Sequence, residues 1–348
     1  MNAAPSATAG HRAVSVLYQG LLTGTVLTLL ARRGETMAAE LVFRLFRRQH
    51  LEKFLPGVAK LGLEGLPHAV ACAQYHYLSN RLGGVKTEYL RESDAKAWVR
   101  YPPPRWIWAG ASICAIPSRV NAAMLHGWHG HNGVSLGNPR LGFVCTGQTV
   151  DGQPGLEGYY LEHDHDLGPD ERVRFAPGES MPDADPAQAP RLDPAIWTPD
   201  RLDKVVRSYA MEYVRTLMPV LLDLVGADEM RRVLGHAARL IGMQLYDETA
   251  ALLGVSPDGA AGFAEYLGGL ARAQGETVAS DTSGEVAVIR QTGWRLVDGL
   301  APLPPAVFEA WSELWHGALS VHDRRLRLEI VRTSRAGQDM LEWRIGRL

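Results

Sequence analysis

One stretch of the sequence gathers side chains that could bind a metal or move a proton. Residues 124–148 read MLHGWHGHNGVSLGNPRLGFVCTGQ, and EHDHD follows at residues 162–166. Neutral imidazoles spaced H-x2-H-x-H could bind one divalent transition metal, zinc or iron, with a carboxylate oxygen as a further ligand. The alternative is a solvated, histidine-rich edge. The candidate ligands are His126, His129 and His131, with Glu162, Asp164 or Asp166 supplying the oxygen.

Polar anchors near these histidines could hold a substrate. Arg105 follows three prolines in YPPPRW, a stiff approach that would fix its position. Glycines beside the asparagines would let the backbone come close to a ligand, and arginine can hold a carboxylate through two hydrogen bonds. The alternative places the tryptophans in the core and the arginines on the surface. The candidate substrate-binding residues are Arg105, Trp106, Trp128, Asn132, Asn138 and Arg140.

Composition excludes several classes of function. The 36 basic and 38 acidic residues give a formal charge of −2, which argues against a nucleic-acid partner. The three cysteines have no CxxC or metal-type spacing, which fits a reducing, cytoplasmic compartment. No GxxxxGK[ST], HExxH or GxGxxG motif occurs. A nucleotide cofactor therefore has no support.

The N-terminal residues 1–35 predict an amphipathic helix. Polar residues interrupt its apolar run, which is barely long enough to span a membrane. We therefore expect the helix to pack on the protein or on a partner rather than to anchor in a membrane. The apolar residues that recur at helical spacing are Val14, Leu17, Tyr18, Leu21, Leu22, Val26, Leu29 and Leu30.

The remaining chain indicates a diverged duplication around a linker. Residues 176–200 contain six prolines, and the sequences on either side of them share an order of features. WHG at residues 128–130 returns at residues 315–317, and AWVR at 97–100 matches AVIR at 287–290. PRLGFVCTGQTVDGQPGLEGYYLE also matches RRLRLEIVRTSRAGQDMLEWRIGR without a gap. The predicted domains are repeats over residues 36–175 and 201–348.

Each repeat predicts helices followed by an antiparallel sheet with one inserted helix, an α+β fold. A hairpin turns at Ser93–Asp94 or Asp281–Gly284, and a third strand carries Trp106–Trp108 or Trp294–Val297. A helix then begins at Pro117 or Pro304–Pro305, and two strands surround Gly152 or Gly337. We expect the repeats to pack about a pseudo-twofold axis. The predicted leading helices are Met37–Phe54, Pro67–Arg81, Leu202–Leu224, Ala227–Leu253 and Gly259–Ala273.

The duplication separates structural residues from functional ones. Cys145 matches Ile330 on alternate strand positions, which predicts a core residue rather than a nucleophile. His129 matches His316, which predicts a structural cap at a helix end. His126 matches Glu313 and His131 has no counterpart, so these two remain the catalytic candidates.

The closing hairpin, GQDMLEWRI after EIVRTSRA, resembles that of the 4-vinyl-reductase-type ligand-binding domain. The helix-then-sheet order and the closing RT-x-x-x-G also resemble the L-2-amino-thiazoline-4-carboxylic acid hydrolase family. The turn cysteine of the first family is Leu341 here and Leu156 in the first half. A metal or thiol role of that cysteine therefore cannot be carried over.

These observations lead to three functional hypotheses. The first is hydrolysis of a small polar or carboxylate-bearing substrate, as the hydrolase resemblance implies, with the second half supporting the site or forming a homodimer. In it His126 or His131 acts as general base or holds a metal that activates water, and Arg105 and Arg140 hold the carboxylate. The second is a non-catalytic small-molecule-binding or sensor protein. The third is a subunit whose N-terminal helix docks on another protein.

Overall fold

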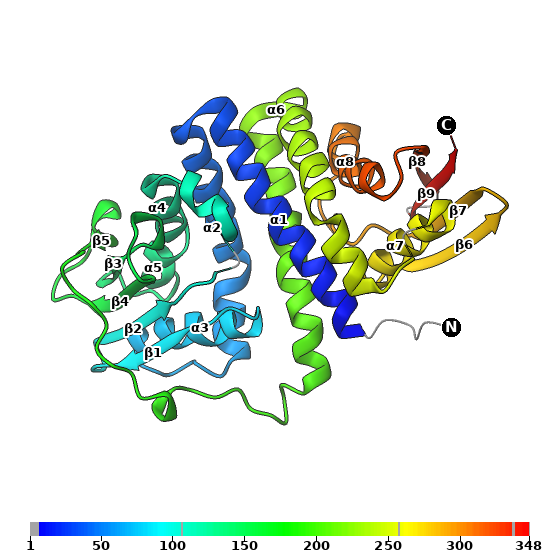
Figure 1. Ribbon diagram of the computed structural model, residues 1–348. Helices are drawn as coiled ribbons and strands as arrows, with labels where there is room; N and C mark the ends of the chain where they lie inside the picture. Colours follow the sequence, from blue (N-terminus) through cyan, green and yellow to red (C-terminus); the bar gives the residue numbers. More distant parts are fainter. Residues whose placement is uncertain (1–6, 106, 257, 336–337, 348) are drawn as a thin grey trace. The chain divides into compact units, whose positions relative to one another are not determined.

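The computed structural model describes residues 7–105, 107–256, 258–335 and 338–347. The chain divides into two compact units (Figure 1). We call Leu29–Leu202 the first unit, and Met1–Thr28 with Asp203–Leu348 the second unit. Each unit contains one sheet and the helices that pack on it, so the predicted α+β class is confirmed.

The sheet of the first unit has the order β1-β2-β4-β3-β5. Strand β5 joins β3 in parallel, and the other pairs are antiparallel. Helix α3 packs on β2 and β4, whereas α2 packs on α4. The strands are β1 (Glu88–Arg91), β2 (Lys96–Tyr101), β3 (Leu141–Gly147), β4 (Leu156–Glu162) and β5 (Val173–Phe175). The helices are α2 (Glu35–Lys60), α3 (His68–Leu82), α4 (Ser118–Gly127) and α5 (Asn132–Ser135), with 3-10 turns η1 (Gly110–Ala115), η2 (His129–His131), η3 (Thr149–Asp151), η4 (Pro169–Glu171) and η5 (Pro186–Gln188).

Both faces of this sheet are covered at β3, because every residue of that strand is buried. The proline-rich segment predicted as a linker contributes to that cover. Its Met181 is buried against Trp98, Val144 and Tyr159. The segment therefore packs on the sheet of the first unit over part of its length.

The sheet of the second unit has the order β6-β7-β9-β8, and all its pairs are antiparallel. The predicted break between two helices after Leu224 is confirmed within α6, where Gly226 has a φ of 77° that a helix cannot continue. The strands are β6 (Thr277–Ser283), β7 (Val286–Thr292), β8 (Leu326–Arg335) and β9 (Gln338–Arg347). The helices are α1 (Ala7–Arg33), α6 (Pro199–Leu253), α7 (Gly259–Gln274) and α8 (Pro305–His322).

Helix α1 forms part of the core of the second unit (Figure 1). All the apolar residues predicted for its inner face are buried except Leu30, which is partly exposed. The helix approaches α6 closely, because a Cβ atom on Gly24 would lie 2.9 Å from Ile241 Cγ1. Within the described residues, one helix, α1, is long enough and apolar enough to cross a membrane. Of its 18-residue apolar stretch, 56% is buried inside the protein.

The two sheets share their strand order and the register of their central pairs. The pairs of β3 with β4 and of β8 with β9 follow the gapless sequence match, and the pairs of β2 with β4 and of β7 with β9 follow the AWVR–AVIR match. The duplication and its pseudo-twofold packing remain predictions. The equivalent pairs are Leu141–Glu162 and Leu326–Arg347, and Ala97–Tyr160 and Ala287–Ile345.

The predicted third strand is wrong in both units. Trp108 lies in a turn with a φ of 57°, and residues 294–297 also form turns. Three prolines before Trp106 and Gly110 after it interrupt the first of these segments, so it cannot complete a ladder of backbone hydrogen bonds. Trp106 and Gly337 themselves lie outside the described residues.

Candidate ligand-binding site

A cluster of buried polar side chains lies between the helices and the sheet of the first unit. His50 comes from α2, His76 from α3, His129 from η2, Asn132 from α5 and Tyr160 from β4. Each of these residues is at most 6% exposed. Five separate elements therefore bring polar groups into one buried region. We call these five residues the imidazole cluster.

Hydrogen bonds fix the orientation of the cluster. The Asn132 amide donates to the Tyr160 hydroxyl at 2.8 Å and to His76 Nε2 at 3.2 Å. Because the Tyr160 oxygen accepts from Asn132, its own proton is available to His129 Nδ1, which lies 2.7 Å away. We therefore assign the proton of His76 to Nδ1 and that of His129 to Nε2.

The three imidazoles are neutral at physiological pH. Burial lowers the pKa of His50 and of His76 to about 3 in each case. Burial, followed by the charges of His76 and Arg105, holds the pKa of His129 well below its ordinary value. Burial also raises the pKa of Tyr160, which keeps its hydroxyl protonated.

Some polar atoms of this region have no hydrogen-bond partner among the described residues. They are His50 Nε2, Asn132 Oδ1 and the indole nitrogen of Trp128. Trp128 packs edge-on against His50, with ring centroids 5.8 Å apart. An unsatisfied buried group is costly, so these atoms are places where a water molecule or a ligand atom would stabilise the protein.

A small cavity of about 190 Å³ opens in the same unit. Its wall is mostly apolar, and its polar lining comes from Arg105, Asn121 and Thr149. Asn121 accepts a hydrogen bond from the Trp108 indole at 3.0 Å and donates to Gln148 at 2.8 Å. Thr149 Oγ1 is buried without a hydrogen-bond partner among the described residues. The cavity thus combines an apolar wall with a few fixed polar groups, as ligand sites do.

Arg105 connects this cavity with the imidazole cluster. Its guanidinium lies over the Tyr101 ring, 4.9 Å from the centroid, and it also lines the cavity. Its positive charge is close enough to lower the pKa of His129. An anion in the cavity would therefore meet a cation, with a neutral histidine beyond it.

The predicted metal ligands are not brought together. Helix α4 ends at Gly127, so His126 and His129 do not share a helical face as predicted. His129 turns into the core, while Asp164 lies on the surface, 2.7 Å from His165. Within the described residues, no group of three or more His, Cys, Asp or Glu side chains could hold a metal ion.

The predicted helix cap is also assigned to the wrong histidine. The carbonyl of His126, near the end of α4, accepts a hydrogen bond from His131 Nδ1 at 2.9 Å. His131 therefore caps the helix, and His129 does not. His316 lies inside α8, which continues to His322, so it is not at a helix end either. His126 and His131 are partly exposed and do not line the cavity. The His131 ring does contact the cluster, with its centroid 6.2 Å from that of His50.

Two further predicted residues belong to a different place. Arg140 forms an ion pair with Glu162 at 2.6 Å, and Asn138 bonds to His68 at 3.1 Å. These four residues line an open depression of about 610 Å³ that Arg105 does not line. Arg105 and Arg140 were predicted to hold one carboxylate together. Because they line different cavities, they are not placed to do so.

Sequence reasoning missed His50 and His76. Both occur singly in helical segments, within RRQHLEKF and AQYHYL, far from the histidine-rich stretch. The local signal was available, because His76 is surrounded by apolar residues on a helix buried almost all round. A histidine at such a position needs a polar partner.

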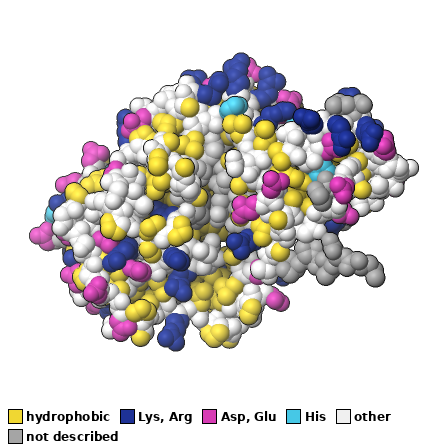
Figure 2. All heavy atoms as spheres, in the orientation of Figure 1, with side chains coloured by type: hydrophobic (Ala, Val, Ile, Leu, Met, Phe, Trp, Pro, Cys, Tyr) yellow, Lys and Arg dark blue, Asp and Glu magenta, His cyan; other side chains and the backbone are white. Residues whose placement is uncertain are grey.

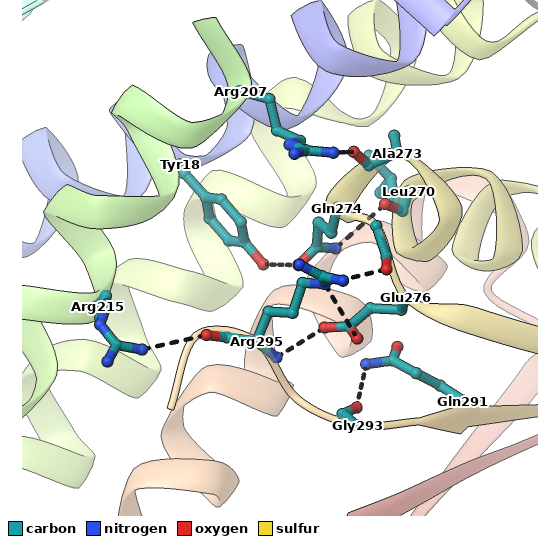
Figure 3. A network of polar contacts seen from close by, with 11 residues as sticks. Tyr18, Arg207, Arg215, Leu270, Ala273, Gln274, Glu276, Gln291, Gly293 and Arg295 are labelled. Carbon is teal, nitrogen blue, oxygen red and sulfur yellow. Dashed lines mark hydrogen bonds and ion pairs between the residues drawn. The ribbon is translucent and has the colours of Figure 1, made fainter. Parts of the chain in front are cut away.

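We had expected the second unit to contain fewer buried polar contacts than the first, but it has an extended polar network of its own. Figure 3 shows its network, in which the Tyr18 hydroxyl of α1 donates to Gln274 Oε1 at 2.8 Å. The backbone N–H of Arg295 donates to the buried Glu276 carboxylate at 2.7 Å. Arg207 and Arg215 reach backbone carbonyls beside it. This network ties α1 and α6 to the turn that follows β7.

Comparisons of the chain with protein-family models, with curated proteins and with solved structures find no match. The two family resemblances remain predictions.

Proposed function

We propose that the first unit binds a small carboxylate-bearing molecule in the cavity lined by Arg105, Asn121 and Thr149. The observation that carries this proposal is the position of Arg105, which lines the cavity while its charge reaches His129. A cation beside an apolar wall favours an organic anion, because the guanidinium pairs with the carboxylate and the wall receives the apolar part. At about 190 Å³ the cavity suits a ligand smaller than a typical drug molecule.

Binding without catalysis is the reading that the lining favours. Among the described residues around this cavity there is no histidine, carboxylate or cysteine. The titratable groups of the imidazole cluster are buried and do not line the cavity. The proposal needs neither a metal nor a nucleotide cofactor.

The test measures the binding of benzoate by saturation-transfer NMR. Benzyl alcohol serves as the uncharged comparison. Loss of a charge-assisted hydrogen bond costs about 1.5–3 kcal/mol, so Arg105→Met should weaken benzoate binding by about tenfold or more. Arg105→Lys should keep part of the affinity, because the charge remains. Arg140→Met, which lies in the separate depression, should leave the affinity for benzoate unchanged. Equal binding of benzyl alcohol, or full affinity in Arg105→Met, would refute the proposal.

Hydrolysis is the second candidate, favoured by the hydrogen bond between His129 and Tyr160. Burial keeps His129 neutral, so its Nδ1 can accept the proton that the Tyr160 hydroxyl donates. The test is incubation with L-2-amino-thiazoline-4-carboxylate, followed by proton NMR. If the candidate is correct, the ring opens, and Tyr160→Phe slows turnover while benzoate still binds. An unchanged substrate after prolonged incubation would leave ligand binding alone.

A further inference from the structure

The sheet of the second unit has an open edge where that of the first unit is covered. Strand β8 ends the order β6-β7-β9-β8, and among the described residues no strand lies beyond it. Its counterpart in register, β3, carries β5 on the same side of the sheet. The two units therefore differ in one strand, at one edge.

The first unit shows how such an edge is satisfied. The N–H of Phe143 donates to the carbonyl of Arg172 at 2.8 Å, and the N–H of Ala176 donates to the carbonyl of Cys145 at 2.9 Å. The gapless sequence match places Leu328 and Ile330 at the positions of Phe143 and Cys145. An added strand beside β8 would bond to the backbone at these two residues.

A groove of about 900 Å³ runs beside this edge. Its apolar floor includes Phe308 of α8 with Leu328 and Ile330 of β8. This volume is within the range of ligand-binding sites, and it is much larger than the cavity of the first unit. An apolar groove beside an open strand is the arrangement that receives the alternate side chains of an added peptide strand.

The rim of the groove is positively charged. Four arginines line it against two glutamates, Glu309 and Glu313. Figure 2 shows Lys and Arg side chains gathered over α6 and near α8. The ion pairs leave the cations accessible, because Arg231 and Arg239 remain about half exposed beside their glutamates. The four rim arginines are Arg231, Arg232, Arg239 and Arg332.

We propose that the β8 edge binds an extended, acidic segment of a partner protein as a fifth strand, in the position that β5 takes beside β3. The partner's backbone would pair with β8, its apolar side chains would enter the groove, and its carboxylates would face the rim arginines. A second copy of β8 is a poor occupant. Residues 324–335 contain five arginines and one glutamate, so edge-to-edge pairing would bring like charges together.

The test uses a fluorescein-labelled peptide of alternating glutamate and valine, about six residues long as strands commonly are. Binding is measured by fluorescence anisotropy on the full chain, with three competitors. A lysine–valine peptide tests the charge, the same glutamate–valine peptide with alternate N-methylated amides tests the strand pairing, and glutarate tests a free small anion. Arg231→Glu/Arg232→Glu reverses two exposed rim charges, whereas Arg272→Glu reverses an exposed charge of α7 outside the groove.

The proposal expects saturable binding that the double reversal weakens by about tenfold or more and that Arg272→Glu leaves unchanged. It also expects the peptide to slow amide hydrogen exchange in β8, because bonded edge groups open less often. Three results would overturn strand addition. They are displacement of the labelled peptide by glutarate, competition by the N-methylated peptide as strong as that of the unmethylated one, and amide hydrogen exchange in β8 that the peptide does not slow. Analytical ultracentrifugation tests for self-association of the chain. If self-association prevented peptide binding, a second copy of the chain would occupy the β8 edge, and the proposal would be overturned as well.

Discussion

The imidazole ring of His76 stacks on that of His129, with centroids 4.0 Å apart and ring planes at 16°. Two protonated imidazoles at this separation would repel each other strongly in a buried region. The arrangement is stable only while the rings are neutral. Burial supplies that condition, because it lowers the pKa of both histidines.

This relationship predicts that stability depends on pH through His76. The unfolded imidazole titrates near 6.5 and the folded one near 3, so between these values the unfolded state binds more protons. Stability should therefore fall with decreasing pH by about 1.4 kcal/mol per pH unit from this residue alone. His76→Phe keeps a stacked ring but removes the titration. The variant should be less stable at pH 7, since Asn132 loses an acceptor, and its urea midpoint should fall less steeply between pH 6.5 and 4.5.

The matched control is Val144→Ala. Val144 packs against Trp98 and Met181 on the face of the sheet away from His76, so the substitution removes packing without removing or uncovering a histidine. Its midpoint should be lowered at every pH with the slope of the wild type. A His76→Phe slope equal to that of Val144→Ala would mean that His76 is already protonated in the folded protein over this pH range.

Much of the fold follows from local sequence patterns. The turn residues Ser93–Asp94 and Gly152 lie between paired antiparallel strands, as predicted. The turn predicted at Asp281–Gly284 is shorter, because β6 continues to Ser283 and only Gly284 and Glu285 form the turn. These features depend on neighbours along the chain, which a sequence displays directly.

The candidate site follows from the sequence only in part. His129, Asn132 and Arg105 were singled out, but a metal was expected where the structure has a neutral, hydrogen-bonded cluster. The partners that decide the chemistry, His50 and His76, come from α2 and α3. Spacing within one stretch of chain cannot show which distant helix will face it. The metal hypothesis therefore counted three nearby histidines and missed His76, which stacks on His129, and His50, which packs against Trp128.

The crossing of α6 and α8 predicts two intolerant glycines. A Cβ atom on Gly317 would lie 2.0 Å from the carbonyl oxygen of Arg239, and one on Gly242 would lie 2.0 Å from that of Leu314. Backbone atoms cannot rotate away, so the helices would have to separate. Gly317→Ala should therefore cost about 3 kcal/mol or more, although alanine favours a helix by about 1 kcal/mol.

Gly235, also in α6, provides the comparison. A Cβ atom there would meet its nearest neighbour, Ala310 Cα, at an ordinary 3.6 Å. Gly235→Ala should be neutral or stabilising by up to about 1 kcal/mol, measured by urea unfolding of both variants. Equal stability of Gly235→Ala and Gly317→Ala would contradict the close crossing of the two helices.

Glu276 predicts a substitution that stabilises the second unit. Its carboxylate is buried, and burial raises its pKa even though the Arg295 N–H and guanidinium partly oppose the shift. Above the ordinary pKa of 4.5 the folded state therefore binds more protons than the unfolded state, and stability falls as the pH rises through the raised pKa. Glu276→Gln removes this penalty, while the amide oxygen can still accept the Arg295 N–H. The variant should have the higher urea midpoint at pH 7, and the difference should disappear below pH 4.5.

The control is Glu342→Gln, on a face of β9 where ion pairs with Arg290 and Arg344 lower the pKa of the carboxyl. This substitution should shift the midpoint the opposite way or not at all. A lower midpoint for Glu276→Gln at pH 7 would show that the contact with Arg295 outweighs the cost of burying the charge.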